Sequence, residues 1–240
     1  FETGQEFSSR YTAVNPLCDT DNWQDIFFLK GVDVTVYLYL AKKALGEISK
    51  ILGTNEREKW EKEALKIKAA LLDLSWNEED KIFYDVNPKD FSQVKVKSLT
   101  AFYPFFTDLV NEGQIEAIDK YLLNPEEFLT EFPFPTLSKK DEAYSDKAFW
   151  KNMRRLCPWN GRVWPMTNSH IAEVFANTSK YSTRHKTFLG EFIKKYIKNI
   201  LKEMLSFKII SSTKYYRRQY KCKENFMIKL KSLSKACLLI

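Results

Sequence analysis

The first eleven residues of this 240-residue chain combine the side chains that a sugar-cleaving site needs. They read Phe-Glu-Thr-Gly-Gln-Glu-Phe-Ser-Ser-Arg-Tyr, so carboxylates, hydroxyls and an arginine lie between aromatic residues. Aromatic rings stack on the apolar faces of a hexose, and breaking a glycosidic bond requires an acid that protonates the leaving oxygen. Glu6 is the candidate acid. The alternative is a surface loop that is rich in polar residues.

The segment resembles the signature of the trehalases, the processing α-glucosidases and the mannosylglycerate-type hydrolases, a group of inverting enzymes. The residues that agree with this signature are Glu2, Gly4, Ser8, Ser9, Arg10 and Tyr11. Glu6 stands where the general acid of the group is an Asp. The extra methylene carries the carboxyl about 1.5 Å further from the backbone, and a misplacement near 1 Å can cost about a hundredfold in rate. The backbone would therefore have to retreat at this position.

A second block, residues 157–168, places two tryptophans, an asparagine, a glycine and an arginine on one loop ahead of a predicted helix. Trp rings are well suited to stack on a pyranose face. The block resembles the second signature of the same group, and the best matches are Trp159, Asn160 and Trp164. Core packing at a helix entry is the alternative for both tryptophans.

Two further segments add to the resemblance. Residues 31–34 resemble a Val-Asp-Leu segment of the group through Asp33, which would also serve as a helix N-cap. Residues 138–144, with Asp141 and Tyr144, loosely resemble a loop of the processing-glucosidase branch. Because four blocks occur in the right order, we interpret the chain as a member of this group.

The resemblance implies an all-α fold, an incomplete α/α toroid that is part of a barrel of six helical hairpins, with long aromatic loops that contain proline. It also implies hydrolysis of a terminal α-glycosidic bond with inversion, with Glu6 as the proton donor. The expected sugar-contacting residues are Glu2, Gln5, Arg10, Tyr11, Asp33, Trp159, Asn160 and Trp164. Neither a metal ion nor a cofactor is implied, and the expected partner is a carbohydrate substrate.

The general base that an inverting enzyme requires is not found in the sequence. It should be a second carboxylate, roughly 6.5 to 9.5 Å from the acid. In the resembled group it is a Glu near the end of the barrel, often followed by an aromatic residue, Asn and Pro, whereas Glu224 has other neighbours. The chain, which opens on Phe1 without an initiator Met, is therefore expected to be an inactive and poorly soluble fragment. A non-catalytic carbohydrate-binding relative is the main alternative.

Hydrophobic periodicity predicts several helices. The first, from Asp33 to Leu52, should bury one stripe and end at Gly53, and a second should follow antiparallel to it and form an α/α hairpin. The expected stripe of the first is Val34, Leu38, Ala41, Leu45, Ile48 and Leu52, and that of the second is Trp60, Ala64, Ile67, Leu71 and Leu74. Residues 81–86 read as extended, and further helices are expected at 99–110, 114–123, 166–176 and 187–205. Prolines exclude a helix from 124–146, which predicts a long ordered loop.

Charge divides the chain into two parts. Residues 180–240 carry sixteen basic and three acidic residues, a net charge of +13, and residues 1–179 carry a net charge of −6. The predicted division is a partial hydrolase domain over 1–205 and a basic tail over 206–240. The tail is a basic extension that binds nucleic acid or an acidic membrane, a partner-binding helix, or the product of a lost reading frame, which alone would also explain the missing base. The acidic first part argues against a nucleic-acid-binding protein.

Composition and cysteine spacing narrow the class of protein further. With 44% hydrophobic and 15% aromatic residues the chain has the composition of a folded protein, and no apolar run is long enough to span a membrane. The four cysteines show no C-x-x-C pair, which favours free thiols over a metal site or a disulfide framework.

Overall fold

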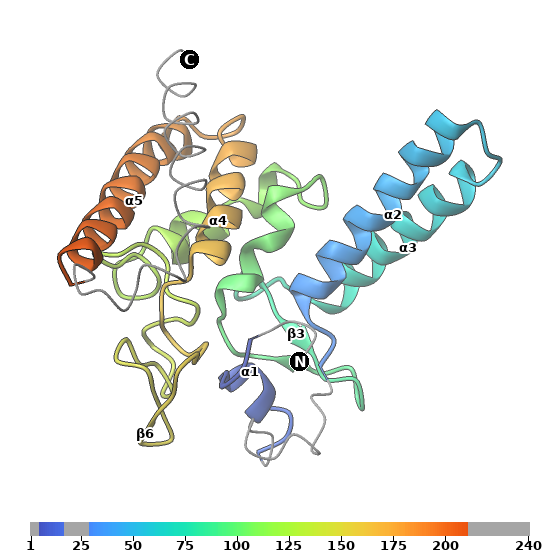
Figure 1. Cartoon of the computed structure of the whole chain (residues 1–240). Coiled ribbons are helices and arrows are strands. Elements are labelled where there is room, and N and C mark those ends of the chain that lie inside the picture. Colours follow the sequence, from blue (N-terminus) through green and yellow to red (C-terminus); the bar gives the residue numbers. More distant parts are fainter. Residues whose placement is uncertain (1–4, 17–28, 211–240) are drawn as a thin grey trace. The chain divides into compact units, whose positions relative to one another are not determined.

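The computed structural model describes residues 5–16 and 29–210, with side chains placed up to residue 198 (Figure 1). The chain divides into two compact units, residues 1–193 and residues 194–240, and the site and its supporting elements belong to the first unit. The helical elements are α1 (Ser9–Thr12), α2 (Val32–Leu52), α3 (Arg57–Leu74), the 3-10 segments η1 (Leu99–Phe106) and η2 (Glu112–Gln114), the π-helical turn η3 (Ile118–Leu122), α4 (Pro165–Thr178) and α5 (Thr183–Ile210), which continues into the second unit.

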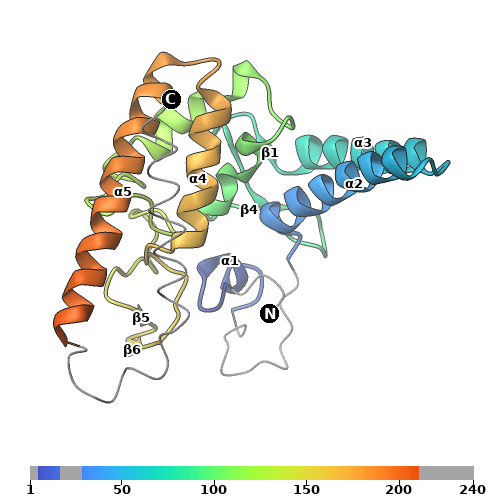
Figure 2. The ribbon, with the colours of Figure 1, turned by 45° about the horizontal axis from the view of Figure 1, so that its top comes forward.

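The predicted α/α hairpin is confirmed. Helices α2 and α3 lie side by side and antiparallel in Figures 1 and 2. Helix α2 ends at Gly53, whose backbone is left-handed (φ 66°) and whose N–H donates to the carbonyl of Lys50. A left-handed residue after the last helical turn is the usual place for glycine, because it has no β-carbon to clash.

The prediction of which face of α2 is buried is wrong. Its predicted stripe is exposed among the described residues, with Leu38 at 47% and Ile48 at 49% of their full accessibility. The buried positions are instead Val32, Asp33, Val36, Tyr39, Gly46 and Ser49. A β-carbon on Gly46 would lie 3.9 Å from Trp60 and 3.7 Å from Glu61, which is an ordinary packing distance, so α3 covers this side of α2. Periodicity found the helix but not the side that α3 and η1 cover.

Three short antiparallel strand pairs interrupt the helices of the described ranges. They are β1 (Trp76–Asn77) with β2 (Ile82–Phe83), β3 (Asp85–Val86) with β4 (Gln93–Val94), and β5 (Phe149–Trp150) with β6 (Met153–Arg154). The extended segment predicted over 81–86 is thus confirmed. The turn that precedes this segment, over residues 76–80, begins with the strand β1. A backbone bridge between Lys30 and Val86 ties β3 to the entry of α2.

The core of the unit is built around η1, which is buried over nearly its whole length and contacts α2 and α4. The helix predicted over 99–110 is instead a 3-10 segment that ends at Phe106 and contains Pro104, which has no N–H to donate along the segment. The predicted helix over 166–176 is α4, and the first turns of α5 pack on it through Phe175 and Phe188, whose ring centroids are 4.7 Å apart (Figure 2).

The long loop predicted over 124–146 is confirmed and is anchored from within. The buried carboxylate of Glu127 forms an ion pair with Lys97 and accepts a hydrogen bond from the Ser138 hydroxyl. The ring of Phe134 is also buried and lies against Phe175 and Phe192. None of the helices in the described ranges is both long enough and apolar enough to cross a bilayer.

Candidate active site

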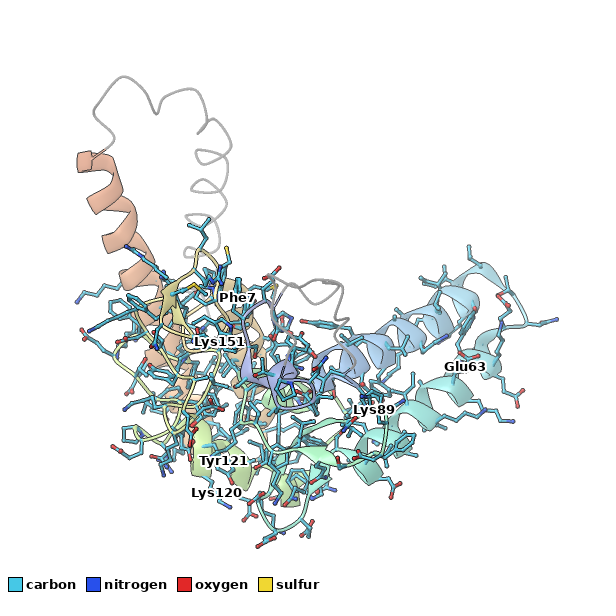
Figure 3. The ribbon with its side chains drawn as sticks, turned by 90° about the horizontal axis from the view of Figure 1, so that it is seen from below. Phe7, Glu63, Lys89, Lys120, Tyr121 and Lys151 are labelled. Carbon is cyan, nitrogen blue, oxygen red and sulfur yellow. The ribbon has the colours of Figure 1, made fainter. Side chains whose placement is uncertain are left out.

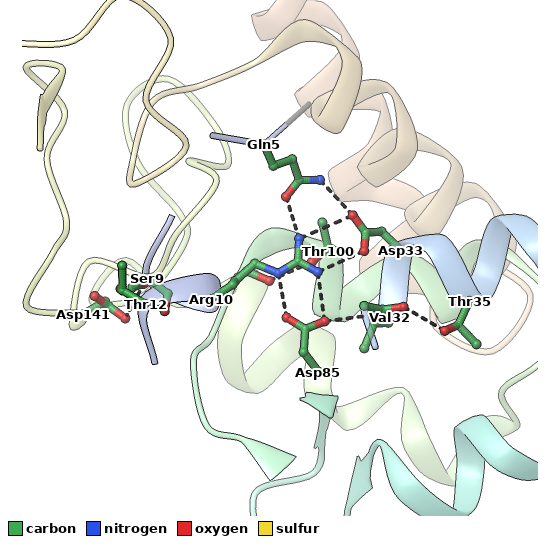
Figure 4. Close-up of polar contacts among 12 residues, drawn as sticks. Gln5, Ser9, Arg10, Thr12, Val32, Asp33, Thr35, Asp85, Thr100 and Asp141 are labelled. Atoms are coloured by element: carbon green, nitrogen blue, oxygen red, sulfur yellow. Dashed lines mark hydrogen bonds and ion pairs between the residues drawn. The ribbon is translucent and has the colours of Figure 1, made fainter. Parts of the chain in front are cut away.

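The guanidinium of Arg10 lies at the centre of a buried polar cluster that joins the first sequence block to two other segments (Figure 4). Its Nε and Nη2 donate to the two carboxylate oxygens of Asp85 at 2.6 and 2.9 Å. Nη2 and Nη1 donate to the two oxygens of Asp33 at 2.9 and 3.3 Å, and Nη1 also donates to Oε1 of Gln5 at 2.6 Å. All five guanidinium N–H groups are therefore paired within the protein. We refer to Gln5, Arg10, Asp33 and Asp85 as the arginine clamp.

Asp85 is the member of the clamp that sequence reasoning missed. It comes from β3, where it was expected only as one residue of an extended segment. It is 3% exposed, and besides Arg10 it accepts a hydrogen bond from the Val32 N–H at 2.9 Å, at the start of α2. Nothing in the spacing of the sequence relates residue 85 to residue 10. The only available signal is an acidic residue between Tyr84 and Val86, which are themselves buried.

Arg10 and Asp33 are both ionised over the ordinary pH range. Burial acts to raise the pKa of Asp33, but the charge and hydrogen bonds of Arg10 outweigh it, so this pKa lies below its usual value. Burial likewise acts to lower the pKa of Arg10, and the charges of Asp33 and Asp85 overcome that effect and keep the guanidinium protonated. A buried charge is tolerated only when it is paired and hydrogen-bonded in this way.

Gly31 leaves room for the clamp. A β-carbon at this position would come within 2.6 Å of Asp33 Oδ1 and 3.2 Å of Arg10 Nη2. The first distance is closer than real β-carbons approach any atom, so a larger residue would displace the carboxylate. The glycine of the 31–34 block is thus explained by close packing. Gly31 is also the N-cap of α2, so the N-cap role expected for Asp33 is wrong, and Asp33 is the second residue of the helix.

Glu6, the candidate acid, is partly exposed, and its carboxylate has no hydrogen-bond or ion-pair partner among the described residues. Its carbonyl oxygen accepts a hydrogen bond from the Trp159 N–H at 3.0 Å. The next residue, Phe7, has a left-handed backbone (φ 55°), which is uncommon for a bulky residue and typical of functional sites. The ring of Phe7, labelled in Figure 3, lies 6.3 Å from that of Trp150 and 4.9 Å from the guanidinium carbon of Arg155.

The two tryptophans of the second block stack on one another. Their ring centroids are 4.6 Å apart and their planes differ by 2°. Trp159 is 6% exposed, and Trp164 is more accessible and immediately precedes α4. The side chain of Asn160 is buried and donates to the carbonyls of Ala143 and Phe149, both at 2.7 Å. Asn160 therefore holds the surrounding loops together.

The fourth block also reaches the first. The hydroxyl of Ser9 donates to Asp141 at 3.2 Å, and the ring of Tyr144 lies so close to the backbone of Gly161 that a β-carbon there would meet it at 2.8 Å. All four blocks singled out from the sequence therefore meet at residues 5–10. Tyr11 is buried beside Arg10, whereas Glu2 lies outside the described residues.

Comparison with known protein families shows to which family the chain belongs. The family of the mannosylglycerate hydrolase MGH1-like glycoside hydrolase domain matches residues 3–207. The chain belongs to this family. The match confirms the resemblance that the sequence blocks predicted.

Two solved structures show the fold. Neutral trehalase Nth1 from Saccharomyces cerevisiae aligns with 76% of the chain at 15% identity and a TM-score of 0.60. The GH63 mannosylglycerate hydrolase from Thermus thermophilus, in complex with glucose, aligns with 69% at 16% identity and a TM-score of 0.54. The predicted fold class, part of an α/α toroid, is confirmed, although small strand pairs accompany the helices.

The alignments cover only part of these proteins. The chain spans 33% of the trehalase and 37% of the mannosylglycerate hydrolase. An uncharacterized protein from Borreliella burgdorferi is 29% identical over 87 residues, which are 36% of this chain and 18% of that protein. In each comparison the chain therefore corresponds to a part of a longer protein.

Proposed function

We propose that this chain supplies the proton-donor side of a glycoside hydrolase that cleaves a terminal α-glycosidic bond with inversion. The observation that carries the proposal is the convergence of four sequence blocks on residues 5–10, in a chain that belongs to a glycoside hydrolase family. At the centre of that convergence is a carboxylate without a partner among the described residues, and a proton donor must be free to face its substrate.

Glu6 is the proton donor in this proposal. As the bond between the anomeric carbon and the leaving oxygen breaks, the carboxyl proton of Glu6 passes to that oxygen. A water molecule adds to the anomeric carbon from the opposite face and gives its proton to a general base. The base stays unassigned, because the sequence carries no segment that resembles the one the family uses.

The sugar-binding part of the proposal rests on the stacked tryptophans. Trp164 is the more accessible ring, so it is the better candidate to contact a pyranose face, while Trp159 supports it from behind. Tyr11 and Asn160 are buried and contribute through the walls of the site. The related proteins are named as a trehalase and a mannosylglycerate hydrolase, and one of them was solved with glucose, which favours a gluco- or manno-configured substrate.

The proposal is tested by following an α-glycoside by proton NMR. Trehalose, α-mannosylglycerate and 4-nitrophenyl α-glucoside are incubated with the protein, with and without azide, which can replace a missing base and nucleophilic water. With azide we expect a glycosyl azide of β configuration at the earliest time points, because azide attacks the anomeric carbon without the missing base. A product of α configuration would contradict inversion. Sugar binding without any product, even with azide, would favour a non-catalytic carbohydrate-binding relative.

A further inference from the structure

We propose that Asp85 is a positioning residue for the proton donor, and that Arg10 and Asp33 act with it to set the Glu6 segment rather than to hold sugar hydroxyls. This inference rests on the proposed role of Glu6. It differs from the interpretation of the sequence, in which Arg10 and Asp33 contact the substrate, and it adds a residue from a part of the chain that no block includes.

Arg10 has no donor left for a sugar. Its five N–H groups are taken by two oxygens of Asp85, two oxygens of Asp33 and one oxygen of Gln5, and its side chain is fully buried. A substrate hydroxyl could reach the guanidinium only by breaking one of these charge-assisted bonds, which are roughly twice as strong as neutral ones. The geometry of the arginine clamp is therefore that of a structural ion pair, not of a substrate-binding site.

The arginine clamp fixes both ends of the short segment that carries Glu6. Gln5 lies directly before Glu6, and its side chain joins both Arg10 and Asp33, with Nε2 donating to Asp33 Oδ2 at 2.9 Å. Arg10 lies four residues after Glu6 and enters the same clamp. Both ends of this segment are therefore fixed at one point, and the Trp159 N–H holds the Glu6 carbonyl between them. The position of the Glu6 carboxyl depends on this closure.

Asp85 sets the plane of the Arg10 guanidinium. It receives Nε and Nη2 side by side, the bidentate arrangement that fixes a guanidinium in orientation as well as in distance. Its strand, β3, is tied by the backbone bridge between Val86 and Lys30 to the start of α2, which carries Asp33. The two carboxylates are thereby held at a fixed spacing, into which one arginine fits.

The test compares Asp85→Asn with Asp108→Asn in the full chain. Asp108, whose side chain is 59% exposed, is the control for loss of a carboxylate that holds α2, because it accepts hydrogen bonds from Tyr39 and Lys43 but none from residues 5–10. Hydrogen exchange of the Trp159 amide reports on whether the Glu6 carbonyl stays in place, and the Val174 amide, in α4, reports on global unfolding. In Asp85→Asn we expect the Trp159 amide to exchange about tenfold faster or more, relative to Val174. The control should leave the ratio unchanged.

A second readout separates a positioning role from a purely structural one. If Glu6 is displaced, azide-supported turnover of methyl α-glucoside, which needs a proton donor, should fall about tenfold or more relative to 4-nitrophenyl α-glucoside, while KM changes little. A loss of folded protein would lower both rates equally. Should Asp85→Asn fail to fold, Asp85→Glu is used instead, because it keeps the charge but shifts the Arg10 guanidinium. The same changes in the exchange ratio and in the ratio of the two rates are expected for it.

The two readouts distinguish the failure of each claim. Unchanged ratios in both experiments would overturn the positioning role of Asp85. A faster Trp159 amide without any azide transfer by the unmodified chain would support the clamp and count against the proposed function. If Asp85→Asn slowed both substrates equally and also weakened glucose binding, Arg10 would contact the sugar and the inference would be wrong.

Discussion

Replacement of Arg10 by methionine should destabilise the protein more than most single substitutions. Met has a similar volume but no charge, so Arg10→Met leaves the buried carboxylates of Asp33 and Asp85 without their cation. Breaking a buried ion pair by removing one partner costs about 3 to 5 kcal/mol, because the remaining charge is uncompensated. That is a large share of the roughly 5 to 15 kcal/mol that stabilises a typical domain.

The loss is measurable by thermal unfolding of the chain followed by circular dichroism. For a chain of this size the cost corresponds to a fall in Tm of roughly 6 to 20 °C at pH 7. The deficit should shrink on acidification. The folded pKa of Asp33 lies below its ordinary value of 3.8, so the clamp stabilises the wild type above that pH and ceases to do so as the pH falls through the folded pKa.

The triple variant Arg10→Met, Asp33→Asn, Asp85→Asn is the control. It removes the uncompensated charges and should recover part of the lost stability, since replacing a whole buried ion group by neutral residues is often tolerated. A fall in Tm of less than about 2 °C for Arg10→Met, which corresponds to under about 1 kcal/mol, would refute the reasoning. So would a deficit that stayed constant from pH 7 to pH 3.

Three other parts of the structure give further predictions. Gly31→Ala should destabilise the protein by about 1 to 3 kcal/mol through displacement of Asp33, whereas Gly190→Ala, whose β-carbon meets nothing, should be neutral or stabilising; equal effects in urea unfolding would contradict this. Burial lowers the pKa of His185, despite the charge of Asp119, so stability should decline as the pH falls below about 6.5, and His185→Gln should flatten that slope. Leu38→Gln with Ile48→Gln should reduce self-association of the chain in light scattering, because both side chains belong to an exposed apolar stripe; a wild type that is monomeric at the same concentration would count against the role of that stripe.

Much of the fold could be predicted from the sequence because its helices are long and periodic. The hairpin of α2 and α3, its end at Gly53, α4 and the ordered loop over 124–146 all correspond to local signals of apolar spacing, glycine or proline. The buried side of α2 could not be predicted in the same way. Which side of a helix is covered depends on what packs there, and α3 approaches the side that carries Gly46 rather than the more apolar one.

The sequence blocks that form the candidate site could be predicted, but most contacts between their residues could not. The signature around Glu6 and the tryptophan block could be matched to a family by eye, and the structure brings them together through the bond between Trp159 and Glu6. The contact of Arg10 with Asp85 could not be predicted, because it joins a helical turn to a two-residue strand with no spacing rule between them. The residue types alone likewise do not reveal that Arg10 and Asp33 donate to and accept from each other, because these hydrogen bonds depend on the geometry of the fold.

The role of Glu6 is the central claim, and Glu6→Gln tests it most directly. Hydrolysis or azide transfer is measured for methyl α-glucoside and 4-nitrophenyl α-glucoside with both proteins. Gln cannot donate the proton, so the rate with the methyl glycoside should fall by about 10²-fold or more, the usual contribution of general acid catalysis, while the nitrophenyl glycoside, with its good leaving group, should lose much less. Equal losses on both substrates, in a variant that remains folded, would contradict the assignment of Glu6 as the proton donor.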